Sequence, residues 1–194
     1  MTRAQALVAD APPPRARLTG VVYLLYFLTA VSDEVFIGRH QLVLYDIVNL
    51  IAHVFYIAVT LLFYYMFRPV NRSLSLLAAL FSLAGCANDV LDLFNLAPYK
   101  INSVVFFAPY CLLIGWLTFS STFLPRTIGV LMALAGVGWL IFLTPLVHLL
   151  STYVQVLGFI AEASLMLWLT VKGVNVQKWY ELAAARGVAA PPAP

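Results

Sequence analysis

The sequence predicts an all-α membrane protein, a polytopic bundle of six transmembrane helices with both termini in the cytoplasm. Of the 194 residues, 63% are hydrophobic and 10% are charged, and the mean hydropathy of +0.94 lies far outside the range of soluble domains. Apolar runs long enough to cross a bilayer, about 20 residues each, recur six times and leave no room for a second folded domain. Basic residues gather in alternate connections between these runs.

Polar breaks divide the chain into a tail, a transmembrane domain and a second tail. Residues 1–17 are polar and rich in Ala and Pro, so we expect a disordered cytoplasmic tail. The transmembrane domain is expected over residues 18–179, and residues 180–194 form the C-terminal cytoplasmic tail. The six helices are expected at about residues 18–37, which we interpret as a retained signal anchor, and at 42–67, 73–96, 103–122, 127–149 and 151–171.

Local signals support several of these boundaries. Pro69 ends the second helix because it lacks an N–H and its ring blocks continuation, and Asn71 or Ser73 is suited to cap the third helix. The fifth helix carries four small residues that permit close helix contact, namely Gly129, Ala133, Gly136 and Gly138. Trp179 follows the last span and is expected to anchor the chain at the membrane interface.

The basic residues predict the orientation. An even number of spans places both termini on one side, together with nine of the eleven Lys and Arg residues. These nine are Arg3, Arg15, Arg17, Arg68, Arg72, Arg126, Lys172, Lys178 and Arg186. Only Arg39 and Lys100 lie opposite, so the positive-inside rule places both termini in the cytoplasm. This explains the net charge of +3 without a nucleic-acid partner.

The stretch from residue 82 to 95 places polar side chains inside an apolar run. At about 100° per residue, Asn88, Asp89 and Asp92 fall on one side of a helix. A charge at the bilayer centre costs at least about 2.5–3.5 kcal/mol, and carboxylates retained there are functional candidates. The alternative interpretation is a polar stripe that only joins this helix to its neighbours. The sequence leaves both open.

Other expected helices carry polar groups at similar depths, which predicts an outward-opening cavity. His53 and Glu162 are expected at its floor. The expected walls are Asp46, Asn49, Asp89, Asp92, Asp33 and Glu34. The candidate catalytic residues are Asp89, Asp92, Glu162 and His53. The candidate ligand-binding residues are Asp46, Asn49, Asn88, Asp33, Glu34, Gln155, Tyr26 and Tyr56.

The chemistry of such a cavity is acid–base chemistry. Glu162 is expected to be the general acid and Asp89 and Asp92 to share one proton, whereas His53 is either half of an acid–base pair or a structural partner of a carboxylate. Aromatic residues make up 14% of the chain and suit a developing carbocation, although they also fill membrane bundles. No metal-binding spacing or cofactor motif occurs, and Cys86 and Cys111 are expected as small apolar residues.

Three functions fit these features. The first is binding of an amphiphilic or isoprenoid-like small molecule, with acid–base catalysis of the isomerase, cyclase or hydrolase type left open. The second is a small proton-coupled transporter. The third is a non-catalytic accessory subunit of a membrane complex. The expected partners are the lipid bilayer and the small molecule, with a second copy of the chain or another membrane subunit as further candidates.

The sequence also resembles a known family. The resemblance is carried by residues 123–139, Glu162, residues 167–169 and residues 172–179, with residues 17–25 and 67–72 as two further landmarks. These segments resemble the bacterial multi-pass membrane family named domain of unknown function 4386. The resemblance implies six helices and these turn signatures. It implies no activity.

Overall fold

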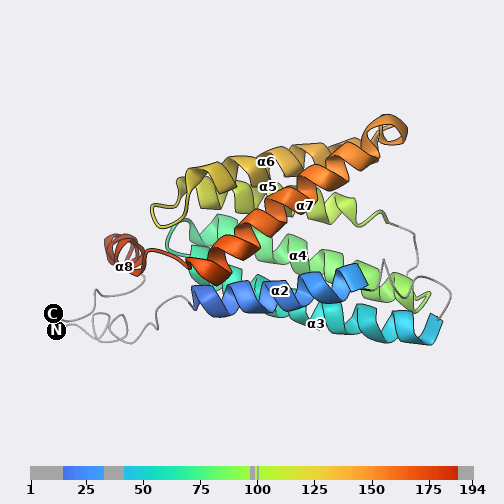
Figure 1. The fold of residues 1–194 in the computed structure, drawn as a ribbon, viewed down its shortest axis with the longest axis horizontal. Helices are drawn as coiled ribbons and strands as arrows, with labels where there is room; N and C mark the ends of the chain where they lie inside the picture. Colours follow the sequence, from blue (N-terminus) through green and yellow to red (C-terminus); the bar gives the residue numbers. More distant parts are fainter. Residues whose placement is uncertain (1–14, 33–41, 97–98, 100, 188–194) are drawn as a thin grey trace.

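The structure is a computed structural model that describes residues 15–32, 42–96, 99 and 101–187. Within these ranges the chain forms helices and no strand. The helices are α2 (Ala16–Ser32), α3 (Leu42–Phe67), α4 (Arg72–Leu93), α5 (Val104–Ser120), α6 (Arg126–Leu140), the short 3-10 helix η3 (Ile141–Leu143), α7 (Val147–Val171) and α8 (Val176–Ala185). Helices α2 to α7 run along one long axis in an up-and-down arrangement, and α8 lies beyond one end of this bundle (Figure 1). The predicted all-α class is confirmed.

The helices have the length and composition of membrane spans. Four stretches of helix in the described residues are long and apolar enough to cross a bilayer, and these are Leu44–Phe67, Arg72–Leu93, Arg126–Leu143 and Val147–Val171. Helices α2 and α5 are apolar too but shorter, with 17 residues each. Large apolar side chains such as Val54, Trp116 and Leu149 are exposed, as expected where a helix faces lipid rather than water. The protein is an integral membrane protein.

Backbone contact between α5 and α6 explains three of the four small residues predicted in the fifth helix, namely Gly129, Ala133 and Gly136. A methyl group on Gly129 would come within 2.8 Å of the carbonyl oxygen of Gly115, and one on Gly115 would come within 2.6 Å of the amide nitrogen of Ala133. Gly136 meets the backbone and side chain of Leu112 in the same way. Because backbone atoms cannot move aside, only small residues allow this crossing.

The predicted cap of the third helix is confirmed, whereas its predicted end is three residues too late. The Asn71 side chain accepts a hydrogen bond from the Leu74 amide (3.0 Å) at the start of α4. At the other end Asn95 has a φ of 55°, and the amides of Asn95 and Leu96 donate to the carbonyls of Asp92 (3.0 Å) and Leu91 (2.8 Å). This is the Schellman arrangement that terminates helices, so Asn95 is a capping residue.

The predicted end of the fifth helix at residue 149 is wrong. Helix α6 ends at Leu140, η3 follows, and α7 begins at Val147. Pro145 explains the break, because proline lacks an N–H and holds the preceding residue away from helical geometry. Thr144 accordingly has extended backbone angles (φ −123°, ψ 161°).

Helix α8 lies in a region where the sequence predicted the end of the membrane domain and a tail. The Asn175 side chain caps it by accepting from the Lys178 amide (3.1 Å). Trp179 is 1% exposed, and its Nε1–H donates to the carbonyl of Met66 (2.9 Å) at the end of α3. The prediction that Trp179 anchors the chain at the lipid interface is therefore wrong, because its ring lies inside the protein and fastens α8 to the bundle.

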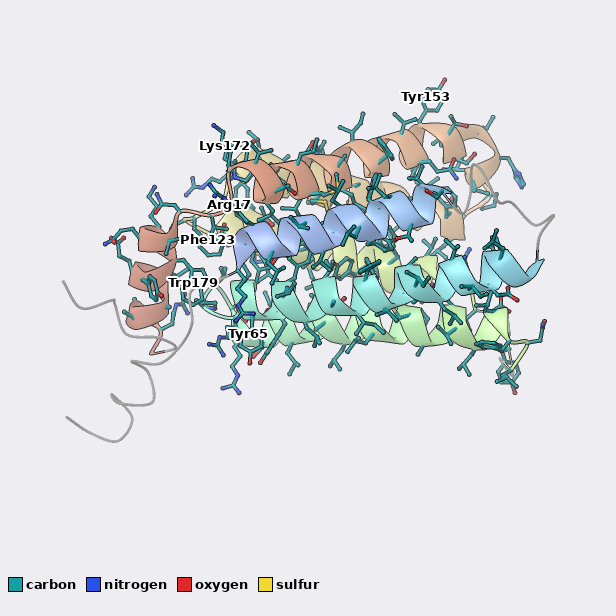
Figure 2. All side chains as sticks on the ribbon, turned by 60° about the horizontal axis from the view of Figure 1, so that its bottom comes forward. Arg17, Tyr65, Phe123, Tyr153, Lys172 and Trp179 are labelled. Carbon is teal, nitrogen blue, oxygen red and sulfur yellow. The ribbon has the colours of Figure 1, made fainter. Side chains whose placement is uncertain are left out.

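Charge is distributed unevenly along the bundle. The described basic residues lie at the end that carries α8, and they are Arg15, Arg17, Arg68, Arg72, Arg126, Lys172, Lys178 and Arg186. Figure 2 shows Arg17 and Lys172 at this end, with Trp179 nearby and Tyr153 at the far end. The side chains of Asp46, Asp89 and Asp92 belong to the end far from α8.

Candidate functional site

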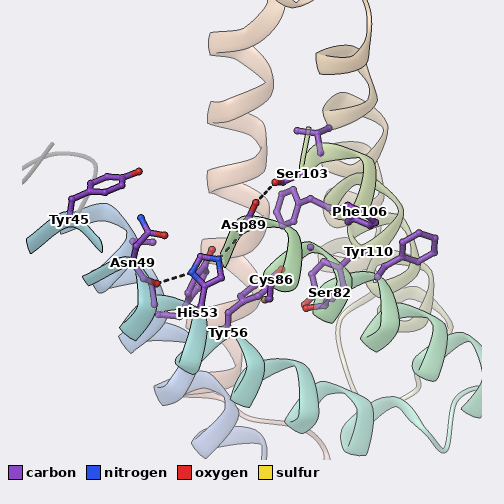
Figure 3. A pocket seen from close by; sticks show the side chains of 17 residues that line it. Tyr45, Asn49, His53, Tyr56, Ser82, Cys86, Asp89, Ser103, Phe106 and Tyr110 are labelled. Carbon is purple, nitrogen blue, oxygen red and sulfur yellow. Dashed lines mark hydrogen bonds and ion pairs between the residues drawn. The ribbon is translucent and has the colours of Figure 1, made fainter. Parts of the chain in front are cut away.

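A cavity of about 370 Å³ lies between α2, α3, α4 and α5, in the half of the bundle far from α8. Its walls are formed by Tyr26, Ala30, Tyr45, Asn49, Ala52, His53, Tyr56, Phe81, Ser82, Gly85, Cys86, Asp89, Ser103, Val104, Phe106, Phe107 and Tyr110. The wall is mainly aromatic and apolar, with polar groups at a few positions (Figure 3). Natural binding sites for small molecules have this composition.

One side of the cavity carries a histidine and a carboxylate from different helices. Nε2 of His53 lies 3.6 Å from Oδ2 of Asp89, and Nδ1 of His53 lies 2.8 Å from the carbonyl oxygen of Asn49 one turn earlier. Since a carbonyl oxygen only accepts, Nδ1 carries the proton of this bond and Nε2 is the nitrogen that faces Asp89. Figure 3 shows the ring held between these partners. His53 is 16% exposed and Asp89 41% exposed.

The segment before α5 completes this polar side. The hydroxyl of Ser103 donates to Oδ1 of Asp89. Nδ2 of Asn88 donates to the Ile101 carbonyl (3.1 Å) and lies 3.1 Å from Oγ of Ser103. Asn88 was predicted as a ligand-binding residue, but it is outside the cavity wall. It fastens the start of α5 to α4 and thereby positions Ser103 beside Asp89.

The cavity wall also carries tyrosines. Tyr56 and Tyr110 are more than nine-tenths buried, and their rings lie 5.9 Å apart in a T-shaped arrangement. The hydroxyl groups of Tyr56 and Tyr110 are close enough to influence each other. These hydroxyls nevertheless form no well-aligned hydrogen bond with any described residue. Tyr26 packs against Tyr56 at 4.7 Å between ring centroids.

Glu162 lies in the bundle but outside the cavity wall. It is 8% exposed, and its Oε2 accepts a hydrogen bond from the hydroxyl of Tyr23 (2.9 Å), which joins α7 to α2. The Tyr23 ring stacks on Tyr26 at 6.0 Å, and Tyr26 lines the cavity. The prediction that His53 and Glu162 together form the cavity floor is therefore wrong. His53 lines the cavity, whereas Glu162 is separated from it by the rings of Tyr23 and Tyr26.

The remaining predicted residues do not line the cavity. Asp92 and Gln155 are exposed, and Asp46 is half-buried at the start of α3. Asp89 and Asp92 differ although one helical turn separates them, since Asp89 lines the cavity and Asp92 does not. Asp33 and Glu34 lie outside the described residues. Asn49, His53, Asp89, Tyr26 and Tyr56 are the predicted residues that the structure brings together.

The sequence analysis missed several wall residues, including Ser82, Cys86, Ser103 and Tyr110. A signal was present for the first two, because Ser82, Gly85, Cys86 and Asp89 follow the i, i+3, i+4, i+7 spacing of one helix face. Ser103 and Tyr110 had no such signal, since their helix carries no acid or histidine to mark the cavity side. Among the described residues no group of three His, Cys, Asp or Glu side chains is placed to hold a metal ion.

Comparison with known proteins finds a family model that matches part of this chain. The model of the family described as Domain of unknown function (DUF4386) matches residues 90–173. The similarity to the DUF4386 family is therefore limited to this segment. The match confirms the resemblance over residues 123–139, Glu162 and residues 167–169, whereas the landmarks at residues 17–25 and 67–72 lie outside it. The matched segment contains α5, α6 and α7. It begins immediately after Asp89 and excludes His53, so the match carries no information on that pair.

A more distant relative gives no further assignment. The chain is similar to an "Uncharacterized protein" of Archaeoglobus fulgidus, with 29% identity over 131 residues, covering 60% of this chain and 76% of the relative. No solved structure matches the chain. The comparisons therefore show a similarity to the DUF4386 family over part of the chain and assign no activity, so the function is argued from the site itself.

Proposed function

We propose that the protein binds an amphiphilic or isoprenoid-like small molecule in the cavity between α2, α3, α4 and α5. The observation that carries this proposal is a cavity of about 370 Å³ whose wall holds two buried tyrosine hydroxyls, those of Tyr56 and Tyr110, that form no well-aligned hydrogen bond with a described residue. A buried polar group left unsatisfied costs about 1–3 kcal/mol. A polar atom of a bound molecule, or water held in its place, removes this cost.

The size and composition of the cavity support the same proposal. Sites for small molecules usually enclose roughly 300–1,000 Å³ and combine apolar walls with a few polar groups. The present cavity is at the lower end of that range, at about 370 Å³. An amphiphile suits this wall, because its apolar part packs on Phe81, Phe106 and Phe107 while its polar part reaches His53 and Asp89.

The His53 and Asp89 pair is the proposed centre for acid–base chemistry. His53 is oriented by the carbonyl of Asn49, and Asp89 is oriented by the hydroxyl of Ser103. A general acid or base must be held within reach of the proton that it transfers, and Nε2 of His53 is held at the cavity wall in this way. Acid–base catalysis by His53 and Asp89 is thus proposed as a further step beyond ligand binding.

The proposed topology has six crossings with both termini in the cytoplasm of the bacterial inner membrane. Helices α2 and α5 have 17 residues each, and about 17–25 residues suffice for a span. The described basic residues lie at the α8 end, which the positive-inside rule assigns to the cytoplasm. The cavity then belongs to the outer half of the membrane.

A cavity-filling variant tests the binding proposal. Gly85 lines the cavity, and among the described residues a Cβ at this position meets only Cβ of Phe106, at 3.4 Å. We expect Gly85→Leu to fill the cavity without disturbing the backbone. Ala84→Leu is the matched control, because Ala84 is the exposed neighbouring residue.

The measurement is native mass spectrometry of the full chain purified in a mild detergent. We expect a bound small molecule in the wild-type protein and in Ala84→Leu, and its loss from Gly85→Leu. Equal occupancy of Gly85→Leu and the wild-type protein would contradict binding in this cavity.

A further inference from the structure

We infer that the cavity selects an organic cation, a small molecule with an ammonium head that lies beside Asp89 and against the aromatic wall. This inference rests on the proposed function, since it requires the cavity to bind a small molecule. It goes beyond that function by assigning the charge of the ligand.

The first argument is the sign of the charges around the cavity. Asp46, Asp89 and Asp92 belong to the half of the bundle that contains it, and Glu162 lies deeper on α7. The described Lys and Arg residues lie at the α8 end, none of them in the cavity wall. A cleft lined by one sign of charge in a low-dielectric medium concentrates ions of the opposite sign. His53 is a basic group of the wall, but with three aspartates in this half of the bundle the fixed charges still favour cations.

The second argument is the state of the Asp89 carboxylate. Oδ1 accepts the hydrogen bond from Ser103, whereas Oδ2 has His53 at 3.6 Å. That separation is longer than a hydrogen bond. Asp89 is also 41% exposed, so Oδ2 has room for a second positively charged partner. If both oxygens of Asp89 formed close hydrogen bonds within the protein, the carboxylate could not bind a cationic ligand in this way.

The third argument is the chemistry of the rest of the wall. Besides Tyr45, the wall contains six Tyr and Phe side chains, namely Tyr26, Tyr56, Phe81, Phe106, Phe107 and Tyr110. Aromatic rings attract cations, and aromatic cages beside carboxylates are a common way to hold quaternary ammonium groups. The hydroxyls of Tyr56 and Tyr110 form no well-aligned hydrogen bond with a described residue, so each oxygen keeps a lone pair that can face a cation. Apart from His53, which already faces Asp89, the described wall offers an anion no basic side chain, since none of the described Lys or Arg residues lines it.

The test compares a cation with its uncharged isostere. Benzyltrimethylammonium and neopentylbenzene have the same shape, because a carbon replaces the nitrogen. Each is titrated into the full chain in a mild non-ionic detergent, with binding measured by isothermal titration calorimetry and corrected for partition into empty micelles. We expect the cation to bind at least about tenfold more tightly than the isostere.

Two aspartate variants identify the source of the selectivity. Asp89→Asn keeps the shape of the side chain and an acceptor for Ser103, and we expect it to lose most of the preference for the cation. Asp92→Asn removes the same charge one turn away, from a residue outside the cavity wall, and we expect it to retain the preference. Retention of selectivity in Asp89→Asn would overturn the assignment of Asp89.

The wild-type comparison keeps the inference falsifiable even if a variant does not fold. Equal or tighter binding of neopentylbenzene would overturn the cation assignment and leave the binding proposal intact. Binding of neither probe would also overturn the cation assignment. The binding proposal would then be judged separately, by whether Gly85→Leu removes a molecule that the wild-type protein retains.

Discussion

Tyr23 and Glu162 show how a single hydrogen bond holds two distant helices together inside the bundle. The Tyr23 hydroxyl is the described partner of the Glu162 carboxyl group, and both side chains are buried. A carboxyl group in such surroundings is costly unless a donor satisfies it. The pair therefore contributes to the packing of α2 on α7, whatever else Glu162 does.

Removing the Tyr23 hydroxyl is expected to destabilise the protein. Tyr23→Phe leaves Oε2 of Glu162 without this donor, at a cost of about 1–3 kcal/mol in the free energy of unfolding. Tyr153→Phe is the control, because Tyr153 is 73% exposed. Thermal unfolding is followed with a thiol-reactive fluorophore, since Cys86 and Cys111 are free and buried. An unchanged transition in Tyr23→Phe would contradict a structural role for the pair.

Two substitutions of Glu162 test whether the hydrogen-bond acceptor, rather than the negative charge, is what stabilises the protein. Glu162→Gln retains an acceptor for the Tyr23 hydroxyl, so we expect it to fold like the wild-type protein. Glu162→Leu removes the acceptor and buries the hydroxyl without a partner, so we expect a lower transition temperature in the same assay. Equal transition temperatures for the two variants would show that the hydrogen bond contributes nothing measurable.

At the scale of elements, helix α8 depends on contacts with segments far away in the sequence. Besides the bond from Trp179 to Met66, the Asn175 amide donates to the carbonyl of Phe123 (3.2 Å). The rings of Phe67 and Phe123 pack at 6.2 Å where the α3–α4 and α5–α6 turns meet. Helix α8 therefore fastens both turns at one end of the bundle.

Shortening the Trp179 side chain is expected to loosen α8. Trp179→Phe removes the Nε1–H donor and leaves the Met66 carbonyl without it. We expect faster hydrogen exchange across residues 176–185, with little change in the spans. Val176→Ala is the control, since Val176 is exposed on the same helix. Unchanged exchange in Trp179→Phe would show that α8 docks through other contacts.

The crossing of α5 and α6 makes a second prediction at this scale. Gly129→Ala places a methyl group against backbone atoms of Phe119 and Gly115, so we expect a destabilisation of about 1–3 kcal/mol. Gly138→Ala is the control on the same helix, because its nearest contact, Cγ1 of Val154, lies at an ordinary 3.4 Å. We expect that variant to change stability by less than about 1 kcal/mol. Equal effects of the two substitutions would contradict the close crossing.

For the whole molecule, the separation of charge along the bundle predicts its orientation in the membrane. Cysteine is placed at Tyr153, near the end far from α8, or at Lys172, near α8 (Figure 2), in a chain with Cys86 and Cys111 replaced by Ala. We expect a membrane-impermeant maleimide to label Tyr153→Cys in intact cells and Lys172→Cys only after permeabilisation. The reverse pattern would invert the proposed topology and place the cavity in the inner half of the membrane.

Much of the fold follows from local sequence, and the candidate site follows from it only in part. Composition and apolar run length predicted the all-α membrane class, and Pro69 and Asn71 correctly marked the turn before α4. The end of the fifth helix was misplaced because Pro145 lies in an apolar run whose hydropathy continues through the break. Asn88 and Asp92 were assigned to the site from helical spacing alone, which gives the side of a helix but not the side chains opposite it.

The sequence by itself determined that this protein lies in a membrane as helices, because apolar length, proline and capping residues act over a few residues of chain. Only the tertiary structure decided that His53 meets Asp89 and Ser103, that Tyr23 satisfies Glu162, and that Trp179 binds α8 to the bundle. Those pairings depend on the rotation and axial offset of each helix against its neighbours. Backbone contacts such as that of Gly115 with Gly129 set these offsets, and they exist only once distant segments have packed together.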